Sequence, residues 1–254
     1  MKRINYREEI NLLNKMYDKI SGSYDERYDG NQFDEIEKYL FSFTNQPKVL
    51  EIGCGTGKWL SGFREFAVGL DLSSEMLSEA KRKNIQNLIL ANGKNLPFKQ
   101  SSFDLVYLVN SFHFFEDKQK VILEIKNVLK QKGRTIIIFA DFFHPRYYWY
   151  LYDIAPEIKE YDIKRYSTSD EIKDLFLSAG FSDIEYSTIS ENKKTFIGDE
   201  VFSDPFIKKH NSSQLANLTN DEYFQKIAKI KELADSGFRF RTDIIFSVIT
   251  AVFR

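Results

Sequence analysis

The sequence predicts an α/β fold, in which a doubly wound and mostly parallel sheet is covered by helices on both faces. Short segments that are apolar almost throughout alternate with segments whose apolar residues recur at helical spacing. Strands of that kind are typical of a parallel sheet buried on both sides. A third observation is the run Gly53, Gly55 and Gly57, which directly follows the first apolar segment and favours a ligand-binding turn there.

The composition fits one α/β domain. The chain has 254 residues, of which 43% are apolar, so a sizeable core is available. A net charge of −1 gives no overall attraction to nucleic acid or to an anionic membrane surface. A single cysteine excludes an intrachain disulfide, and we find no signal segment and no apolar run of membrane-spanning length. We therefore expect a soluble, cytoplasmic protein.

The alternation defines the expected elements. Strands are expected over residues 48–53, 67–71, 88–91, 105–109, 135–140, 184–189 and 244–253. Helices are expected over residues 4–20, 33–43 and 57–66, after the N-cap Ser73, after Asp117, and from the capping boxes Thr168–Glu171 and Thr219–Glu222. The last three of these are expected to end at Gly133, Gly180 and Gly237.

The spacing of the glycines argues against two common phosphate-binding loops. The dinucleotide fingerprint G-x-G-x-x-G needs its third glycine at the position of Lys58. The loop G-x-x-x-x-G-K-[ST] needs one more residue between its glycines, and Trp59 stands where that loop needs a hydroxyl. What remains is the pattern E-x-G-x-G-x-G, which begins at Glu51, with an acid, Asp71, at the end of the second strand.

This pattern resembles the class I S-adenosylmethionine (SAM)-dependent methyltransferases, and in particular those that act on small molecules. Further segments typical of that family occur in order across residues 16–190. They are the Tyr-Asp dipeptides that begin at Tyr17 and Tyr24, Leu-Pro-Phe at 96–98, Ser-Phe-Asp at 102–104 and Ala-Gly-Phe at 179–181. The resemblance implies a Rossmann-like, seven-stranded sheet whose last strand is antiparallel. It also implies SAM as the cofactor and S-adenosylhomocysteine (SAH) as the product.

The resemblance also implies which residues contact the cofactor. Asp71 would accept from the ribose hydroxyls, and Leu72 and Met76 would form apolar walls for the adenine. Asn92 stands where the family has an aspartate that accepts from the adenine amino group, and an asparagine oxygen can accept the same bond. The full set expected at the cofactor is Tyr24, Glu51, Gly53, Cys54, Gly55, Gly57, Asp71, Leu72, Met76, Asn92, Gly93 and Asn110.

His113 and Tyr17 are the candidate catalytic residues. His113 follows the fourth strand, where many relatives carry a histidine, and its role is either that of a general base or that of a packed histidine below the site. Tyr17 belongs either to a segment that caps the cofactor or to an amphipathic packing helix. The histidines and the cysteine lack metal-ligand spacing, so no metal is expected.

A single domain is expected over residues 1–254, with a helical cap at 1–44 and a cofactor-binding core at 45–141. Two insertions, 142–166 and 192–240, interrupt the pattern, and the first is dense in tyrosine. We expect the first insertion and part of the second to form an aromatic lid that selects an apolar or planar acceptor. A satellite core that supports the fold is the alternative.

The expected function is transfer of a methyl group from SAM to oxygen, nitrogen or carbon of a small molecule. Two alternatives stay open, which are methylation of tRNA or protein and cofactor binding by a regulator without turnover. The balanced charge and the lack of an appended RNA-binding module argue against a nucleic-acid partner. The sequence predicts no membrane partner and leaves the oligomeric state undetermined.

Overall fold

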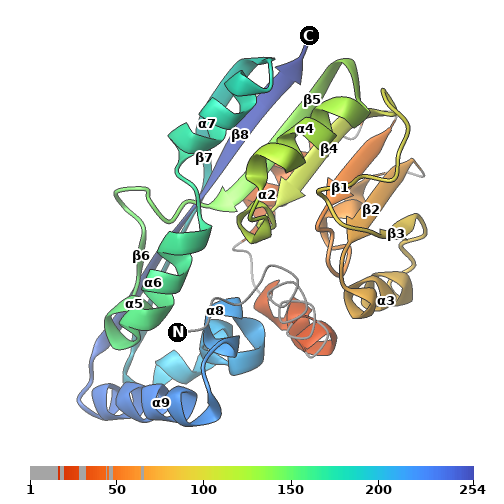
Figure 1. The fold of residues 1–254 in the computed structure, drawn as a ribbon. Helices are drawn as coiled ribbons and strands as arrows, with labels where there is room; N and C mark the ends of the chain where they lie inside the picture. The colour runs from red at the N-terminus through yellow and green to blue at the C-terminus, as the bar shows by residue number, and fades with distance from the viewer. Residues whose placement is uncertain (1–16, 18–19, 29–32, 44, 46–47, 64–65) are drawn as a thin grey trace, which may run out of the picture.

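A mixed sheet forms the centre of the computed structural model, which describes residues 17, 20–28, 33–43, 45, 48–63 and 66–254. Within these residues the sheet has eight strands in the order β3-β2-β1-β4-β5-β8-β6, with β7 paired to β8 (Figure 1). The strands are β1 (Val49–Ile52), β2 (Ala67–Asp71), β3 (Leu88–Leu90), β4 (Phe103–Val109), β5 (Leu129–Ala140), β6 (Tyr148–Trp149), β7 (Phe181–Ile197) and β8 (Arg239–Phe253).

The strand directions agree with the predicted fold class. Strands β1 to β5 pair in parallel, whereas β8 runs antiparallel to β5 and to β7. A mostly parallel sheet with an antiparallel last strand is therefore confirmed. The eighth strand is the short β6, which pairs with the beginning of β8.

Helices and turns connect these strands. The α-helices are α2 (Asp34–Phe41), α3 (Ser74–Arg82), α4 (Lys118–Val128), α5 (Leu151–Ile154), α6 (Pro156–Arg165), α7 (Ser169–Ser178), α8 (Ser213–Ala216) and α9 (Asn220–Asp235). The 3-10 helices are η1 (Ser21–Tyr28), η3 (Trp59–Gly62), η4 (Phe112–Phe114), η5 (Gly198–Ser203), η6 (Pro205–Ile207) and η7 (Lys209–Asn211). Both predicted capping boxes and the caps at Ser73 and Asp117 are present.

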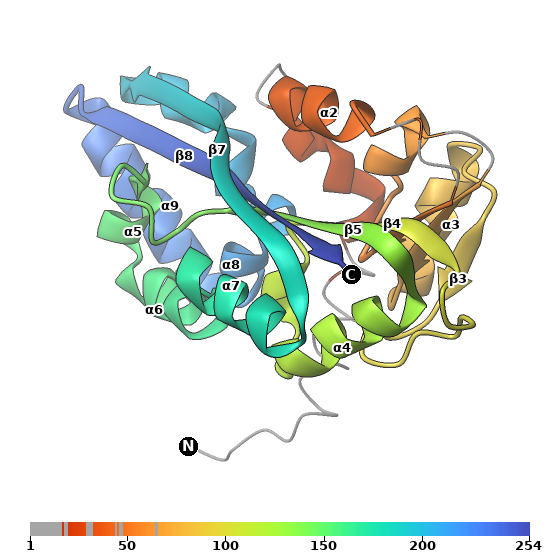
Figure 2. The ribbon, with the colours of Figure 1, turned by 90° about the horizontal axis from the view of Figure 1, so that it is seen from above.

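Helices cover both faces of the sheet, as the apolar strands predict. Figure 2 shows α4 and α7 on one face and α2 on the other. Successive residues of a strand serve opposite faces. Leu50 and Val106 accordingly pack toward α4 and α7, whereas Val49 and Leu105 pack toward α2. The carboxyl ends of the parallel strands are thereby left free to carry a site.

Two predicted helix boundaries are wrong. In place of a helix over residues 57–66, the described residues form only the 3-10 turn η3. Helix α4 ends at Val128 rather than at Gly133, because Gly133 belongs to β5. A Cβ at Gly133 would lie 2.7 Å from the Lys130 carbonyl oxygen. Close packing of the backbone therefore requires this glycine, which does not mark a helix end. The predicted helix over residues 4–20 lies mostly outside the described residues.

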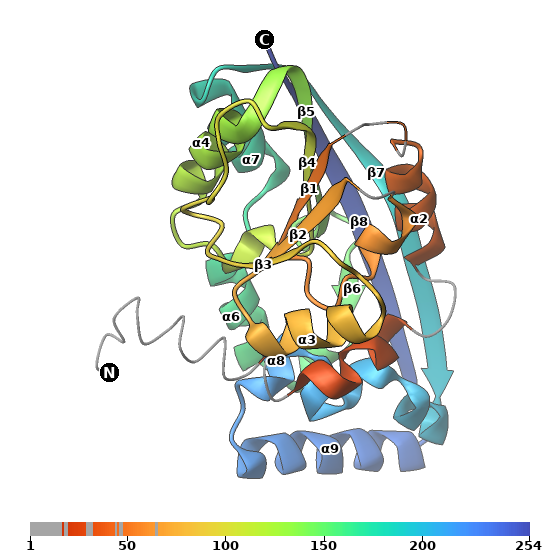
Figure 3. The ribbon, with the colours of Figure 1, turned by 90° about the vertical axis from the view of Figure 1, so that its right-hand side faces the viewer.

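Strands β7 and β8 are much longer than predicted. They pair down to Ile197 and Arg239 with two register shifts on the way, so both ends of the expected insertion 192–240 are strand. Figure 3 shows the two strands running past the parallel strands toward α9. Both insertions pack around this two-stranded ribbon in a core of their own, which includes Trp149, Tyr150, Leu215 and Phe240. We find no helix among the described residues that is long and apolar enough to cross a bilayer.

Candidate functional site

The glycine loop after β1 adopts backbone conformations that only glycine reaches easily. The φ angles of Gly53, Gly55 and Gly57 are +75°, +51° and +76°. A Cβ at Gly53 would lie 2.5 Å from the Ser111 Cβ, and one at Gly57 would lie 2.9 Å from a side-chain carbon of Ile85. A Cβ at Gly55 would meet no atom within 4 Å. The first and third glycines are therefore required by packing, and the middle one leaves open space beside the main chain.

Asp71 holds this loop to the beginning of helix α3. One carboxylate oxygen accepts from the Gly55 backbone N–H at 2.8 Å, and the other accepts from the Ser73 N–H at 2.9 Å. The Ser73 hydroxyl in turn accepts from the Met76 N–H at 3.2 Å and caps α3. The end of β2, the glycine loop and the first turn of α3 are thus fixed relative to one another by one carboxylate.

A first cavity opens over the carboxyl ends of β1, β2 and β4, and its empty space of about 1000 Å³ includes open solvent. The predicted site residues that line this cavity are Tyr17, Tyr24, Gly53, Cys54, Gly55, Asp71, Leu72, Met76, Asn92, Gly93 and Asn110. The structure thus brings together residues that are as much as 93 positions apart in the chain, from Tyr17 to Asn110.

Glu51 and Gly57 do not line this cavity. The Glu51 side chain is fully buried and accepts a hydrogen bond of 3.1 Å from the Tyr107 hydroxyl. Burial raises the pKa of the Glu51 carboxyl well above its usual value, so burial favours its neutral form. Glu51 is thus a buried residue of β1, bonded to Tyr107 of β4. Gly57 packs against Ala80 and Ile85.

Two asparagines at the cavity already make local hydrogen bonds. The Asn92 side-chain oxygen accepts from the Lys94 N–H at 2.9 Å, and that of Asn110 accepts from the Ala140 N–H at 2.9 Å. Asn110 has a φ of +49°, a region that asparagine tolerates better than most residues. Both bonds fix the loops that follow strands, and an amide oxygen keeps a second lone pair for a ligand.

A second cavity of about 940 Å³ adjoins the first. The residues that line both are Tyr17, Tyr24, Tyr28, Asn110 and Phe114. From the first insertion Tyr147, Trp149 and Tyr166 contribute, and from the second Phe196, Phe206 and Gln214. Other rings of the first insertion, such as Tyr150, pack only into the insertion core. Trp149 and Tyr147 take part in both the cavity wall and the insertion core, so the rings of this insertion do not divide cleanly between the two, and the lid stays a prediction.

One face of the β7–β8 ribbon forms a wall of the second cavity. Asn192, Lys194 and Phe196 line it, which is every second residue of β7, and the residues between them are exposed. On β8 the lining residues also alternate, at Thr242, Ile244 and Phe246. Lys194 stands directly opposite Thr242 in the ladder, and Asn192 opposite Ile244.

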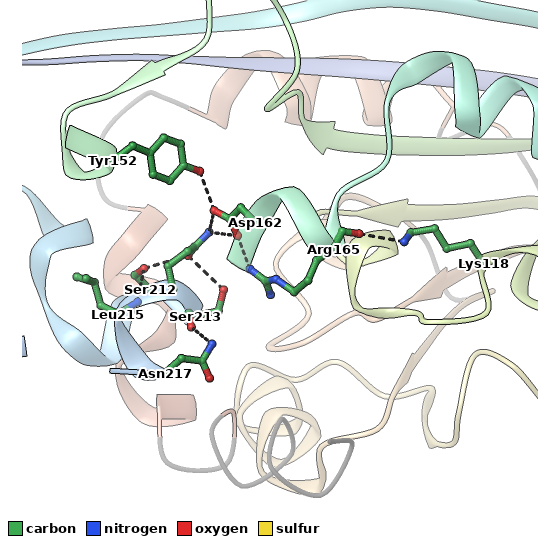
Figure 4. Close-up of polar contacts among 9 residues, drawn as sticks. Lys118, Tyr152, Asp162, Arg165, Ser212, Ser213, Leu215 and Asn217 are labelled. Atoms are coloured by element: carbon green, nitrogen blue, oxygen red, sulfur yellow. Dashed lines mark hydrogen bonds and ion pairs between the residues drawn. The ribbon is translucent and has the colours of Figure 1, made fainter. Parts of the chain in front are cut away.

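A buried acid joins the two insertions behind this cavity. Asp162 of α6 accepts hydrogen bonds from the Tyr152 hydroxyl at 2.7 Å, from Arg165 at 2.5 Å and from the Gln214 amide at 2.9 Å (Figure 4). The Lys118 ammonium donates to the Arg165 carbonyl oxygen at 2.9 Å, which ties α6 to the beginning of α4. The outer wall of the second cavity is therefore anchored to the core of the fold.

Comparison with known proteins now decides the family. Residues 50–137 match the model of a methyltransferase domain. A demethylmenaquinone methyltransferase of Oceanobacillus iheyensis is 31% identical over 167 residues, which cover 54% of this chain and 70% of that protein. The chain belongs to the class I SAM-dependent methyltransferases. The methyltransferase therefore uses SAM as its cofactor.

Two further relatives describe the extent of the likeness. An uncharacterized protein of Methanocaldococcus jannaschii is 32% identical to the methyltransferase over 175 residues, or 67% of this chain and 82% of that one. In fold, the present chain is similar to phosphoethanolamine N-methyltransferase 2 of Haemonchus contortus, solved with phosphomonomethylethanolamine and SAH. The TM-score is 0.62 at 19% identity, with 99% of this chain and 61% of that chain covered. The second likeness concerns the fold alone.

In the methyltransferase, His113 lies at the second cavity and not at the first. Its ring stacks on Tyr166 with centroids 4.2 Å apart and an interplanar angle of 11°. Burial, and then the positive charges of Arg165 and Lys118, lower the pKa of His113 well below its usual value. The imidazole is therefore neutral at physiological pH. His113 is packed in the wall of the second cavity, and its role as a general base stays a prediction.

Tyr17 lies where the two cavities meet. Its ring contacts Phe114 edge-on at 5.4 Å and Tyr24 at 6.0 Å. Burial, together with the neighbouring Tyr24 phenol, raises the pKa of Tyr17 well above its usual value. The phenol therefore stays protonated at neutral pH, so that it can donate a hydrogen bond but cannot act as a phenolate base.

Sequence reasoning missed most of the second cavity. Arg27, Lys194 and Asp204 were not singled out, although each lines it. For Lys194 the signal is local, because Asn192, Lys194 and Phe196 alternate with exposed residues, but two register shifts separate them from the beginning of β7. For Arg27 and Asp204 the chain carries no pattern that we recognise. A group of three or more metal-binding side chains is not found in the described part of the chain.

Proposed function

We propose that this methyltransferase transfers the methyl group of SAM to a small organic acceptor bound in the second cavity. The observation that carries this proposal is the continuity of the two cavities, which share Tyr17, Asn110 and Phe114. A methyl group passes in a single displacement only when donor and acceptor atoms lie in one enclosed space. Two adjoining cavities with one shared wall satisfy that requirement.

The first cavity suits a nucleoside cofactor. The bare main chain at Gly55 allows close approach, and the Asp71 carboxylate, which accepts from the Gly55 and Ser73 N–H groups, lines the same cavity. We assign the ribose hydroxyls to Asp71 and the adenine to the apolar wall of Leu72 and Met76, beside Asn92. The cofactor supplies a methyl group already activated on a sulfonium, so the protein's task is to bind and orient.

The second cavity suits an acceptor with an apolar or planar body. Its walls carry aromatic rings from the N-terminal segment, from both insertions and from the ribbon. Rings on every side exclude water from the reacting atoms and favour flat molecules. We assign the lid role to the lining members of both insertions.

His113 is proposed to accept a proton from an acceptor O–H or N–H. Its neutral imidazole at the second cavity fits that role, because a base must be unprotonated and within reach of the acceptor. Tyr17 is proposed to donate a hydrogen bond at the boundary between cofactor and acceptor. An acceptor whose reacting atom already has a free electron pair needs no base.

The test is methyl transfer from isotope-labelled SAM to a panel of phenols, amines, thiols and enolisable carbonyl compounds. The proposal predicts a labelled product from at least one planar member of the panel. Labelling of tRNA or protein with no labelled small molecule would contradict it. So would SAH binding without any turnover. A cytoplasmic location stays a prediction.

A further inference from the structure

The cross-strand pair Lys194–Thr242 has an unusual setting in the wall of the second cavity. The two residues face each other in the β7–β8 ladder, and both line the cavity. The Thr242 hydroxyl is buried and makes no hydrogen bond to any described residue. Lys194 forms no ion pair with a described carboxylate, whereas its neighbour Lys193, on the outer face, pairs with Glu191. Among the described residues, the charge of Lys194 acts on Asp204, which lines the same cavity without forming an ion pair with it.

Positive charge prevails in this cavity. Of its described lining residues, Arg27 and Lys194 are cations and Asp204 is the acid. Both Asp204 oxygens are engaged, since they accept from the Tyr150 hydroxyl at 2.9 Å and from the Phe206 N–H at 3.0 Å. Burial raises the pKa of Asp204, whereas the Phe206 and Tyr150 donors and the charge of Lys194 lower it. Among the described lining residues, a ligand therefore meets two cations and one acid.

Arg27 extends the positive region toward the cofactor. Its guanidinium donates to the Asn211 carbonyl oxygen and lies 3.9 Å from the centre of the Tyr24 ring. Cations whose water is replaced by aromatic walls are costly to bury unless an anion compensates them. The aromatic lining lowers the local dielectric around Lys194 and so strengthens its attraction to an anionic ligand.

The position of the Lys194–Thr242 pair also indicates how long the acceptor must be. Phe246 of β8 pairs with Ala140, whose N–H is bound by Asn110 at the boundary of the two cavities. Thr242 lies four residues further along β8, and at about 3.3 Å per residue this is a separation of roughly 13 Å. An acceptor that reacts near Asn110 and reaches Lys194 is therefore elongated.

We propose that the acceptor carries an anionic oxygen group (carboxylate, phosphate or sulfonate), which binds the Lys194 ammonium beside Thr242, while its planar body lies between the aromatic walls. This rests on the proposed function, since it takes the second cavity as the acceptor site. Lys194 is then a specificity residue at the end of the acceptor remote from the transferred methyl group. A cationic acceptor, by contrast, would meet Lys194 and Arg27 with like charge.

The test uses two fluorescent probes that differ by one group. Anilinonaphthalene sulfonate has a planar body with an anion, and N-phenylnaphthylamine has the same body without it. Both are titrated into SAH-saturated wild type, Lys194→Met and Lys193→Met, the last as a control on the outer face of the same ribbon. We expect Lys194→Met to weaken the sulfonate by about tenfold or more, because a charge-assisted contact is lost. The neutral probe should bind all three proteins within twofold.

Thr242→Val removes only the hydroxyl. We expect it to lower the affinity for the sulfonate by about two- to tenfold and to leave the affinity for the neutral probe unchanged. The proposal is overturned if Lys194→Met leaves sulfonate affinity unchanged, if Lys193→Met lowers it equally, or if the sulfonate does not bind at all. Calorimetry with SAH distinguishes failure of the anionic-acceptor proposal from failure of the proposed function. Normal SAH affinity with an insensitive sulfonate refutes only the anionic acceptor, whereas absence of SAH binding refutes the cofactor site on which both proposals depend.

Discussion

The Asp71 carboxylate accepts a hydrogen bond of 2.8 Å from the Gly55 backbone N–H, and so fixes the glycine loop to the end of the neighbouring strand. This contact gives Asp71 two tasks, which are holding the loop and, in our proposal, binding the ribose. The loop is thereby shaped before any ligand enters, and less ordering free energy is lost on binding.

Replacing Asp71 should weaken cofactor binding. In Asp71→Ala the Gly55 and Ser73 donors lose their acceptor, and so do the ribose hydroxyls, for a loss of about 1–3 kcal/mol in SAH binding. Isothermal calorimetry measures this loss. Glu75→Gln is the control, because Glu75 is an exposed acid in the first turn of α3. Equal SAH affinity in Asp71→Ala and wild type would place the ribose elsewhere.

Filling the space beside Gly55 should abolish binding without unfolding the protein. Valine at this position would project into space that no protein atom occupies within 4 Å. We expect SAH affinity to fall by more than about a hundredfold, since a buried steric clash cannot be relieved by the fixed loop. Gly237→Val is the matched control. It has a positive φ of +74° and equal open space, but lies at the end of α9. Similar SAH affinities in the two variants would show that backbone strain alone is being measured.

The pH dependence of the reaction should report on His113. A base must be neutral, and burial with Arg165 and Lys118 lowers the pKa of His113, so the acid limb of kcat/KM should lie below pH 6.5. Lys118→Met removes one of these charges, raises that pKa and moves the acid limb to higher pH. Lys120 lies on the same helix and pairs with Glu124, so Lys120→Met should leave the pH profile of kcat/KM unchanged.

The same variants separate a base from a packed histidine. Proton NMR follows the His113 ring during titration, independently of turnover. If Lys118→Met raises the NMR titration midpoint but leaves the kcat/KM profile unmoved, His113 is a packing residue. The lowered pKa of His113 also affects stability. Below about pH 6.5 the unfolded chain binds a proton at this histidine that the folded protein does not bind, so the free energy of unfolding decreases as pH falls.

Glu51 should show the opposite linkage. Burial raises the pKa of its carboxyl in the folded state, so above about pH 4.5 the unfolded chain releases a proton that the folded one keeps. This site therefore costs stability as pH rises, by at most about 1.4 kcal/mol per pH unit. In Glu51→Gln the cost disappears. Urea unfolding at pH 5 and pH 7.5 should show the variant gaining on wild type at the higher pH, and a pH-independent difference would mean that Glu51 is ionised in the fold.

Opening the second cavity should slow transfer without loss of cofactor. Tyr147 lines that cavity only, whereas the adjacent Tyr148 turns toward Asp153 and hydrogen-bonds it. We expect Tyr147→Ala to lower kcat/KM for any acceptor found by about tenfold or more, because the acceptor is less confined and water enters. SAH affinity should be unchanged. Tyr148→Ala should keep near-normal turnover, and equal losses in both variants would indicate a general effect on the insertion.

Local patterns predicted the first cavity but not the second. The glycine spacing and the acid at Asp71 could be read from the chain because one strand, one turn and one neighbouring strand build that cavity. The glycine at 133 misled, since a glycine that permits close backbone approach looks the same in sequence as one that ends a helix. Asn192 and Lys194 are polar, which hid the continuation of β7 into the ribbon. The lowered pKa of His113 comes first from burial and then from the charge of Arg165, 52 positions away, and no local pattern records that distance.

A crystal structure of the protein with SAH bound tests the central claim most directly. The account predicts the nucleoside over Gly55, with its ribose at Asp71, and the sulfur directed past Tyr17 and Asn110 into the second cavity. A sulfur that points away from the second cavity, or SAH bound outside the first one, would contradict it.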